Sequence, residues 1–112
     1  MAEKSNDKDS VLVTGTSKAD SIDNTGSNVT IDGGKGNDTI ENHGGYVSIN
    51  GGMGNDSITN NTTDVTIIGG KGNESIENNI QDVYISGGNG NDYISNDGAN
   101  SKIDAGTDND TI

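Results

Sequence analysis

The sequence predicts an all-β fold, a right-handed parallel β-roll or β-solenoid with 18-residue coils and two parallel sheets. The first observation is a nine-residue motif, Gly-Gly-x-Gly-Asn-(Asp/Glu)-x-Ile-x, which returns every 18 residues and starts at Gly33, Gly51, Gly69 and Gly87. The second is that the large apolar residues keep fixed places within this period. Uninterrupted repetition at a short period is typical of solenoids, and parallel crossovers of this kind are nearly always right-handed.

The composition by itself would suggest a disordered chain. Of 112 residues only 26% are hydrophobic, and the net charge is -12. The repeat argues for order, because the few apolar residues recur at fixed positions. We therefore expect one solenoid domain over residues 11–112, of about five coils, preceded by a disordered polar tail at residues 1–10. The absence of cysteine excludes disulfides and thiolate chemistry.

Two strands are expected in each coil. We number a coil from its first glycine, so that Gly33 is position 1 and Asn50 is position 18. Positions 15 and 17 are apolar around a polar residue, the period-two pattern of a half-buried strand. They are occupied by Val11, Val29, Val47, Val65, Val83 and by Val13, Ile31, Ile49, Ile67, Ile85, Ile103. A second, shorter strand is marked by position 8, which is Ile22, Ile40, Ile58, Ile76, Ile94 and Ile112.

Position 10 is asparagine in five consecutive coils, at Asn24, Asn42, Asn60, Asn78 and Asn96. Its parity matches the isoleucine at position 8, so its side chain should point inward where the second turn begins. We predict an asparagine ladder, in which each amide bonds to turn backbone and to the amide of the next coil. The alternative is that asparagine only tolerates the geometry of a turn.

The glycine turn is a candidate cation site. Glycines at positions 1, 2 and 4 allow several carbonyl oxygens to converge on one point. Position 6 adds a carboxylate in each coil: Asp20, Asp38, Asp56, Glu74, Asp92 and Asp110. Oxygen ligands without His or Cys favour Ca²⁺ over Zn²⁺ or Cu²⁺. Because one turn cannot supply six to eight oxygens, each ion should lie between consecutive coils. The alternative is that the motif forms only a tight solenoid turn.

Calcium should also be coupled to folding. Neighbouring carboxylates at position 6 would repel each other by about 1–3 kcal/mol per pair without a metal ion. The thin Ile/Val core makes the metal-free chain marginal at best, so metal binding should drive folding. We expect three firm sites that join the turns at 33, 51, 69 and 87, with one or two poorer sites at the ends, or about three to five ions in total.

These motifs resemble the RTX, or hemolysin-type, calcium-binding repeats, which form a parallel β-roll. The resemblance covers about residues 11–112. It implies that the first four residues of each turn give carbonyl oxygens to ions on either side and that the position-6 carboxylate is shared. The metal ligands implied are Asp20, Gly33, Gly34, Lys35, Gly36, Asp38, Gly51, Gly52, Met53, Gly54, Asp56, Gly69, Gly70, Lys71, Gly72, Glu74, Gly87, Gly88, Asn89, Gly90, Asp92, Thr107, Asp108 and Asp110.

The sequence departs from that family in its second half-coil, which lacks the spaced glycines. We therefore predict calcium along one edge only. The resemblance further implies a secreted or cell-surface bacterial protein, exported by a type I system, in which the repeats act as a calcium-dependent structural domain. An alternative is an ice-binding or adhesin-type solenoid surface, for which the Ser/Thr-rich row at position 7 is a partial match.

Other classes are less well supported. His43 is the only histidine and lies in a variable turn, and the acidic residues are accounted for as calcium ligands, so we expect no enzyme. The strong acidity disfavours nucleic acid, and no apolar run is long enough for membrane insertion. Uncapped coil ends would allow end-to-end self-association. The pattern does not identify a cell-surface or carbohydrate ligand.

Overall fold

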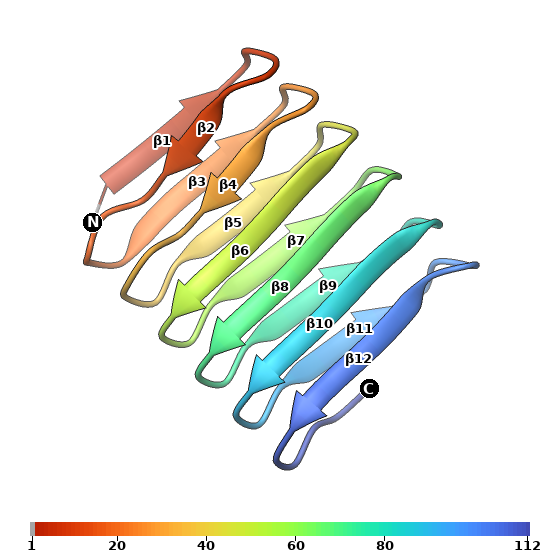
Figure 1. The fold of residues 1–112 in the computed structure, drawn as a ribbon. Coiled ribbons are helices and arrows are strands. Elements are labelled where there is room, and N and C mark those ends of the chain that lie inside the picture. Colours follow the sequence, from red (N-terminus) through yellow and green to blue (C-terminus); the bar gives the residue numbers. More distant parts are fainter. Residues whose placement is uncertain (1) are drawn as a thin grey trace.

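The computed structural model describes residues 2–112, which form two parallel sheets that face each other (Figure 1). The first sheet contains β1 (Ala2–Asn6), β3 (Asp20–Asn24), β5 (Thr39–Asn42), β7 (Ser57–Asn60), β9 (Ser75–Asn78) and β11 (Tyr93–Asn96). The second contains β2 (Leu12–Thr14), β4 (Thr30–Asp32), β6 (Val47–Met53), β8 (Val65–Lys71), β10 (Val83–Asn89) and β12 (Lys102–Thr107). The chain alternates between the sheets and winds in a right-handed sense, which confirms the predicted fold class.

Every strand pairs with the strand one coil further along the chain, and the register is 18 residues throughout. Ile40 lies opposite Ile58 in the first sheet, and Ile49 lies opposite Ile67 in the second. Equivalent positions of all coils therefore form straight rows. Because a slip by one residue would turn the apolar side chains outward, the buried rows fix this register. None of the residues from 2 to 112 belongs to a helix long and apolar enough to cross a membrane.

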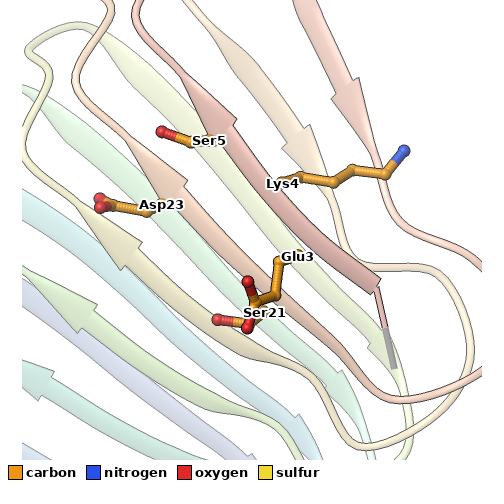
Figure 2. A pocket seen from close by; sticks show the side chains of 5 residues that line it. All are labelled: Glu3, Lys4, Ser5, Ser21 and Asp23. Atoms are coloured by element: carbon orange, nitrogen blue, oxygen red, sulfur yellow. The ribbon is translucent and has the colours of Figure 1, made fainter.

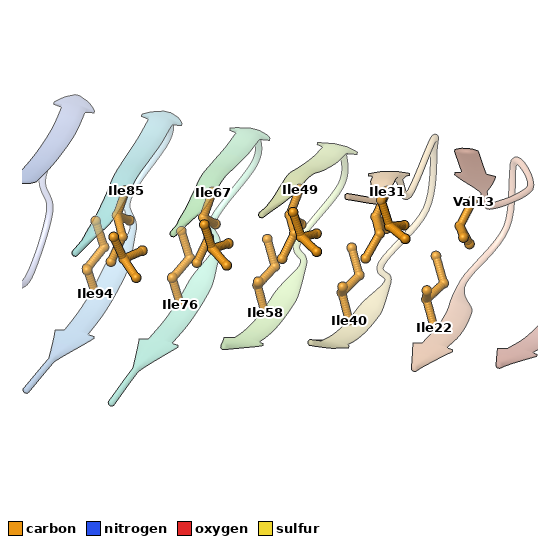
Figure 3. Close-up of a cluster of buried hydrophobic side chains, with 14 residues drawn as sticks. Val13, Ile22, Ile31, Ile40, Ile49, Ile58, Ile67, Ile76, Ile85 and Ile94 are labelled. Carbon is orange, nitrogen blue, oxygen red and sulfur yellow. The ribbon is translucent and has the colours of Figure 1, made fainter. Parts of the chain in front are cut away.

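The core is a single layer of aliphatic side chains between the sheets (Figure 3). Isoleucines from position 8 face the valines and isoleucines of position 17, as predicted. The buried apolar residues are Val13, Ile22, Val29, Ile31, Ile40, Val47, Ile49, Ile58, Val65, Ile67, Ile76, Val83, Ile85 and Ile94. Val11 and Ile103, in the outer coils, are only partly buried against this cluster, and Ile112 is exposed.

The asparagine ladder at position 10 is confirmed. Asn24 Nδ2 donates to Asn42 Oδ1 at 2.8 Å and to the carbonyl oxygen of Gly26 at 2.9 Å, and the Gly26 amide donates back to Asn24 Oδ1 at 3.2 Å. The side-chain bonds between successive asparagines are 2.7–3.0 Å long along the whole stack. Four of these side chains are fully buried. The asparagines thus close the second turn and join the coils, which goes beyond tolerance of turn geometry.

The N-terminal segment differs from the expected disordered tail. Ala2–Asn6 form β1, which pairs with β3 so that Lys4 lies opposite Ile22. Asn6 extends the ladder by one coil, since its Nδ2 donates to Asn24 Oδ1 at 2.7 Å. The sequence signal was an asparagine 18 residues before Asn24. This repeat signal was obscured because the first coil has Lys4 where the other coils have isoleucine. The ammonium group of Lys4 donates a hydrogen bond to the carbonyl oxygen of Thr14 at 2.6 Å. Met1 lies outside the described residues.

The second turn uses a different backbone device from the glycine turn. Position 14 has a φ of 55–59° in six coils although none of its residues is glycine. These residues are Ser10, Asn28, Tyr46, Asp64, Asp82 and Asn100. Asparagine and aspartate tolerate this left-handed conformation best among non-glycine residues. The two edges of the solenoid are therefore chemically distinct, as the sequence indicated.

Candidate functional site

The glycine turns form one continuous edge of the solenoid, at the lower left of Figure 1, where β6 leads into β7 and β8 into β9. Residues at position 3 stack in register from Lys35 through Met53, Lys71 and Asn89 to Thr107. The structure thus brings the predicted site residues of successive coils together. The side chains of Lys35, Met53 and Lys71 are exposed, so only their backbone atoms are available to the turn.

Close stacking of backbone explains the glycines at positions 2 and 4. Gly52 has a φ of 101°, and a Cβ at this position would lie 2.1 Å from the carbonyl oxygen of Gly34 in the preceding coil. Gly54 has a φ of 121°, and its Cβ would lie 2.2 Å from the carbonyl oxygen of Gly36. Any side chain would therefore push the coils apart, and its absence lets carbonyl oxygens of one turn face the next.

The position-6 carboxylates are buried within this edge. Asp20, Asp38, Asp56, Glu74 and Asp92 are each only 1–2% exposed. In most coils one carboxylate oxygen accepts a hydrogen bond from the amide of the position-6 residue in the preceding coil. Asp38 Oδ1 accepts from the Asp20 amide at 2.8 Å, and Asp56 Oδ1 accepts from the Asp38 amide at 2.8 Å. The carboxylates therefore bind adjacent coils to each other, a role that the sequence analysis missed.

In four of these five turns, those of Asp38, Asp56, Glu74 and Asp92, carboxylate oxygens are left without a hydrogen bond of ordinary geometry. Within residues 2–112 these buried atoms are Asp38 Oδ2, Asp56 Oδ2, Asp92 Oδ2 and both Oε1 and Oε2 of Glu74. A buried charged atom without a partner is costly, since it has lost its hydration without compensation. Such atoms recur here in four consecutive coils, so they are a property of the repeat.

These carboxylate oxygens lie beside the position-1 glycine of their own turn, and a carbonyl oxygen of the next coil lies close to the same glycine. A Cβ on Gly33 would lie 2.6 Å from Asp38 Oδ2 and 2.5 Å from the carbonyl oxygen of Gly51. The same arrangement recurs one coil later at Gly51, where the distances are 2.6 Å to Asp56 Oδ2 and 2.5 Å to the carbonyl oxygen of Gly69. Glycine at position 1 thus leaves room between two oxygens from different coils.

The electrostatics agree with this geometry. Burial raises the pKa of Asp38 from its ordinary value of 3.8 to about 6; the charges of Asp56 and Asp20 add to the rise, and the hydrogen bond from the Asp20 amide opposes it. Burial likewise raises the pKa of Asp56. The pKa of Glu74 rises to about 8, through burial first and then the charge of Asp92. Each of these groups would be stabilised by a proton or by a cation.

The donor set consists of oxygen alone. In residues 2–112 no three side chains of His, Cys, Asp or Glu come together in a group able to hold a metal ion. An ion on this edge would therefore take most of its ligands from backbone carbonyls, with carboxylates from the stacked turns. Carbonyl and carboxylate oxygens in a flexible arrangement are what Ca²⁺ accepts, whereas Mg²⁺ requires near-octahedral geometry and keeps several waters.

The two end turns differ from the four central ones. At the N-terminal end Thr16 stands where the other turns have the second glycine, and its hydroxyl donates to Asp20 Oδ1 at 2.9 Å and Oδ2 at 3.0 Å. The Asp20 carboxylate is thus already bonded within its own turn. At the other end Asp110 Oδ1 accepts from the Asp92 amide at 2.9 Å, and the exposed Asp108 accepts from the Gly90 amide at 3.1 Å.

A second asparagine row lies beside the carboxylates at position 5. Asn37 Oδ1 accepts from the Asn55 amide at 2.8 Å, and this bond recurs in each later coil at 2.8–3.0 Å. The row comprises Asn37, Asn55, Asn73, Asn91 and Asn109. Its signal was present in the sequence, since asparagine follows the last glycine of every full motif. It was missed because an exposed turn asparagine is usually explained by its own local geometry.

Two other polar features lie away from the glycine edge. A shallow hollow of about 320 Å³ on β1 and β3 is lined by Glu3, Lys4, Ser5, Ser21 and Asp23 (Figure 2). His43 Nε2 lies 2.9 Å from Glu41 Oε1 in a pair that is half exposed. An exposed pair of this kind contributes little to stability.

The chain matches no protein-family model, no curated protein and no solved structure. Fold and site therefore define its class: a parallel β-solenoid with a row of oxygen-lined glycine turns along one edge.

Proposed function

We propose that this chain is a calcium-binding structural repeat domain whose ions lie between stacked glycine turns. The observation that supports it most is the row of buried carboxylate oxygens without partners, at Asp38, Asp56, Glu74 and Asp92. Each belongs to a turn in which the missing side chain of position 1 leaves space beside a carbonyl oxygen of the next coil. A divalent cation at these places would give the orphaned oxygens their partner and neutralise the charge.

The row would hold the coils together and would couple folding to calcium. The chain has a net charge of -12, and the core is one side chain thick. An ion that binds the stacked turns and not the unfolded chain stabilises the folded state by mass action. Calcium therefore acts here as a structural ligand, and the domain serves as a rigid spacer that is assembled where calcium is abundant. Such conditions hold outside the cell, in agreement with a secreted or cell-surface bacterial protein.

The test is a calcium titration followed by far-ultraviolet circular dichroism, with the number of bound ions measured by calorimetry. We expect little strand signal in excess chelator, a cooperative gain with calcium, and about three to five ions per chain. Full strand content in chelator, with no calorimetric uptake of calcium, would contradict the proposal.

Matched variants separate the site from the overall charge. The double variant Asp38→Asn/Asp56→Asn removes two buried charges and should lower calcium uptake and raise the calcium concentration needed for folding. The control Asp23→Asn/Glu77→Gln removes two charges from exposed positions on the outer face of the first sheet. It should fold at nearly the calcium concentration that the unaltered chain requires, because long-range charge in water is screened.

A further inference from the structure

The row of position-6 carboxylates contains one member that differs in its bonding. Asp38, Asp56, Asp92 and Asp110 each accept the amide of the preceding coil through Oδ1 at 2.8–2.9 Å. Within residues 2–112 the Asp56 amide makes no comparable bond to Glu74: its contact is the weakest influence on the Glu74 pKa, whereas the Asp20 amide is the second strongest on that of Asp38, and both Glu74 oxygens are buried without a hydrogen bond of ordinary geometry. Glu74 therefore leaves two oxygens available where Asp38, Asp56 and Asp92 each leave one.

The extra methylene group of glutamate accounts for this difference. A Cβ on Gly69 would meet Glu74 Cγ at 2.9 Å and Oε2 only at 3.2 Å. In the preceding coil the first carboxylate atom beside Gly51 is Asp56 Oδ2, at 2.6 Å. The glutamate thus places a carbon atom near the point where aspartate places an oxygen, and its carboxylate is less well placed than that of aspartate to accept the amide of the preceding coil.

The geometry points to a cation site at the Glu74 turn that differs from the others in the row. We propose that Glu74 gives both carboxylate oxygens to the ion between the turns at Gly69 and Gly87 and so makes this the most calcium-selective site of the stack. The proposal rests on the calcium-binding function above and deepens it. The carbonyl oxygen of Gly87 lies 2.5 Å from a Cβ on Gly69, so the two turns face each other here as elsewhere in the row.

Selectivity follows from the number of oxygens. Ca²⁺ takes six to eight ligands and readily accepts both oxygens of one carboxylate. Mg²⁺ is smaller and requires near-octahedral geometry with single oxygens, so a paired carboxylate suits it poorly. The carboxylate that reaches further thus selects for the larger ion, while the three aspartate turns discriminate less.

The reciprocal variants Glu74→Asp and Asp56→Glu test this assignment. Calorimetry of the unaltered chain should resolve one ion that differs from the rest in affinity and that Mg²⁺ displaces least. In Glu74→Asp that ion should join the common class, with a loss of about tenfold in its preference for Ca²⁺ over Mg²⁺. Asp56→Glu should create a second ion of the selective class.

Amide hydrogen exchange in the calcium-loaded chain gives a readout independent of affinity. The Asp56 amide should exchange faster than the amides of Asp38 and Glu74, and in Glu74→Asp it should become as protected as they are.

The outcomes separate this assignment from the proposed function. If the unaltered chain binds no calcium, the proposed function itself fails. If it binds several ions of one class, and Glu74→Asp changes neither the preference for Ca²⁺ nor the protection of the Asp56 amide, the assignment to Glu74 is overturned while the calcium function stands. A gain of calcium preference in Glu74→Asp would overturn it equally.

Discussion

At the scale of single residues, the buried amides and carboxylates give the solenoid its order. Asn60 donates to Asn78 Oδ1 at 3.0 Å and to the carbonyl oxygen of Thr62 at 2.7 Å, and it accepts from Asn42 at 2.9 Å. All of its polar atoms are thus engaged although the side chain is fully buried. A fully satisfied buried network of this kind reinforces the register that the aliphatic rows already fix, because any slip would leave buried amide groups without partners.

Removal of Asn60 should therefore be costly. We expect Asn60→Ala to destabilise the calcium-saturated chain by about 3 kcal/mol or more, because it leaves several buried partners unsatisfied. The neighbouring Asn61 is exposed and offers a control; Asn61→Ala should change stability by less than about 0.5 kcal/mol. Urea unfolding monitored by circular dichroism measures both, and equal effects of the two substitutions would refute the ladder as a source of stability.

The buried carboxylates predict an unusual dependence of stability on pH in the metal-free chain. Folding raises the pKa of Asp38 from 3.8 to about 6 and that of Glu74 from 4.5 to about 8. In both cases the folded state binds the proton more tightly, so the favourable contribution is fully present below the unfolded pKa and is lost as pH rises through the folded pKa. Metal-free samples should thus contain more strand near pH 4 than near pH 8.

Calcium should reverse this trend. The ion binds the ionised carboxylates, so its affinity should increase between pH 5 and pH 8. Circular dichroism across this range, with and without calcium, measures both effects. Strand content that rises with pH in calcium-free buffer would show that the carboxylates are stabilised as anions by other means.

At the scale of elements, the two turns of a coil have opposite requirements. The glycine turn brings backbone of adjacent coils into close contact, and the second turn relies on position 14 in a left-handed conformation and on the buried asparagine. The turns can therefore be tested separately.

A single added methyl group should distinguish the two edges. Gly52→Ala places a Cβ 2.1 Å from the carbonyl oxygen of Gly34 at a φ of 101°, so the strain cannot be relieved by a side chain that moves. We expect a loss of about 2–4 kcal/mol and weaker calcium binding. Gly45, in the second turn, has nothing nearer than 3.9 Å to its Cβ position. Gly45→Ala should therefore be nearly neutral in thermal unfolding with calcium, and comparable losses in both variants would contradict the description of the glycine edge.

Much of the architecture could be predicted from the period alone. Isoleucine at positions 8 and 17, with valine at position 15, predicts both strands and the core because side chains in strands alternate between faces. The asparagine ladder followed from the same parity. The pattern was less informative where the repeat weakens: β1 has Lys4 in a place of isoleucine, and only Asn6 continues the period.

The atomic details of the site could not be read from the period. The sequence indicated a carboxylate in every turn, but the hydrogen bond from the amide of one coil to Oδ1 of the next depends on side-chain reach. Side-chain reach also decides the bonding at two other turns. The Thr16 hydroxyl group donates a hydrogen bond to the Asp20 carboxylate, and Glu74 is one methylene group longer than aspartate. These differences between coils arise from contacts across the stack, which a position-by-position comparison of repeats does not reveal.

At the scale of the whole molecule, the solenoid is thin and highly charged. The Cα atoms extend over 35 × 31 × 15 Å, and the third dimension corresponds to two sheets with one layer of side chains between them. Contacts run almost only between adjacent coils, so stability is a sum of similar interfaces between neighbours. A ligand shared between coils would therefore act on every interface of the row at once. This is why we propose a row of ions, and not one site, as the source of order.

A crystal structure of the chain grown with calcium tests this central claim most directly. We expect ions between the turns that begin at Gly33, Gly51, Gly69 and Gly87, in contact with oxygens of Asp38, Asp56, Glu74 or Asp92, and none along the opposite edge. Coils stacked as described, with only water between the glycine turns at millimolar calcium, would contradict it.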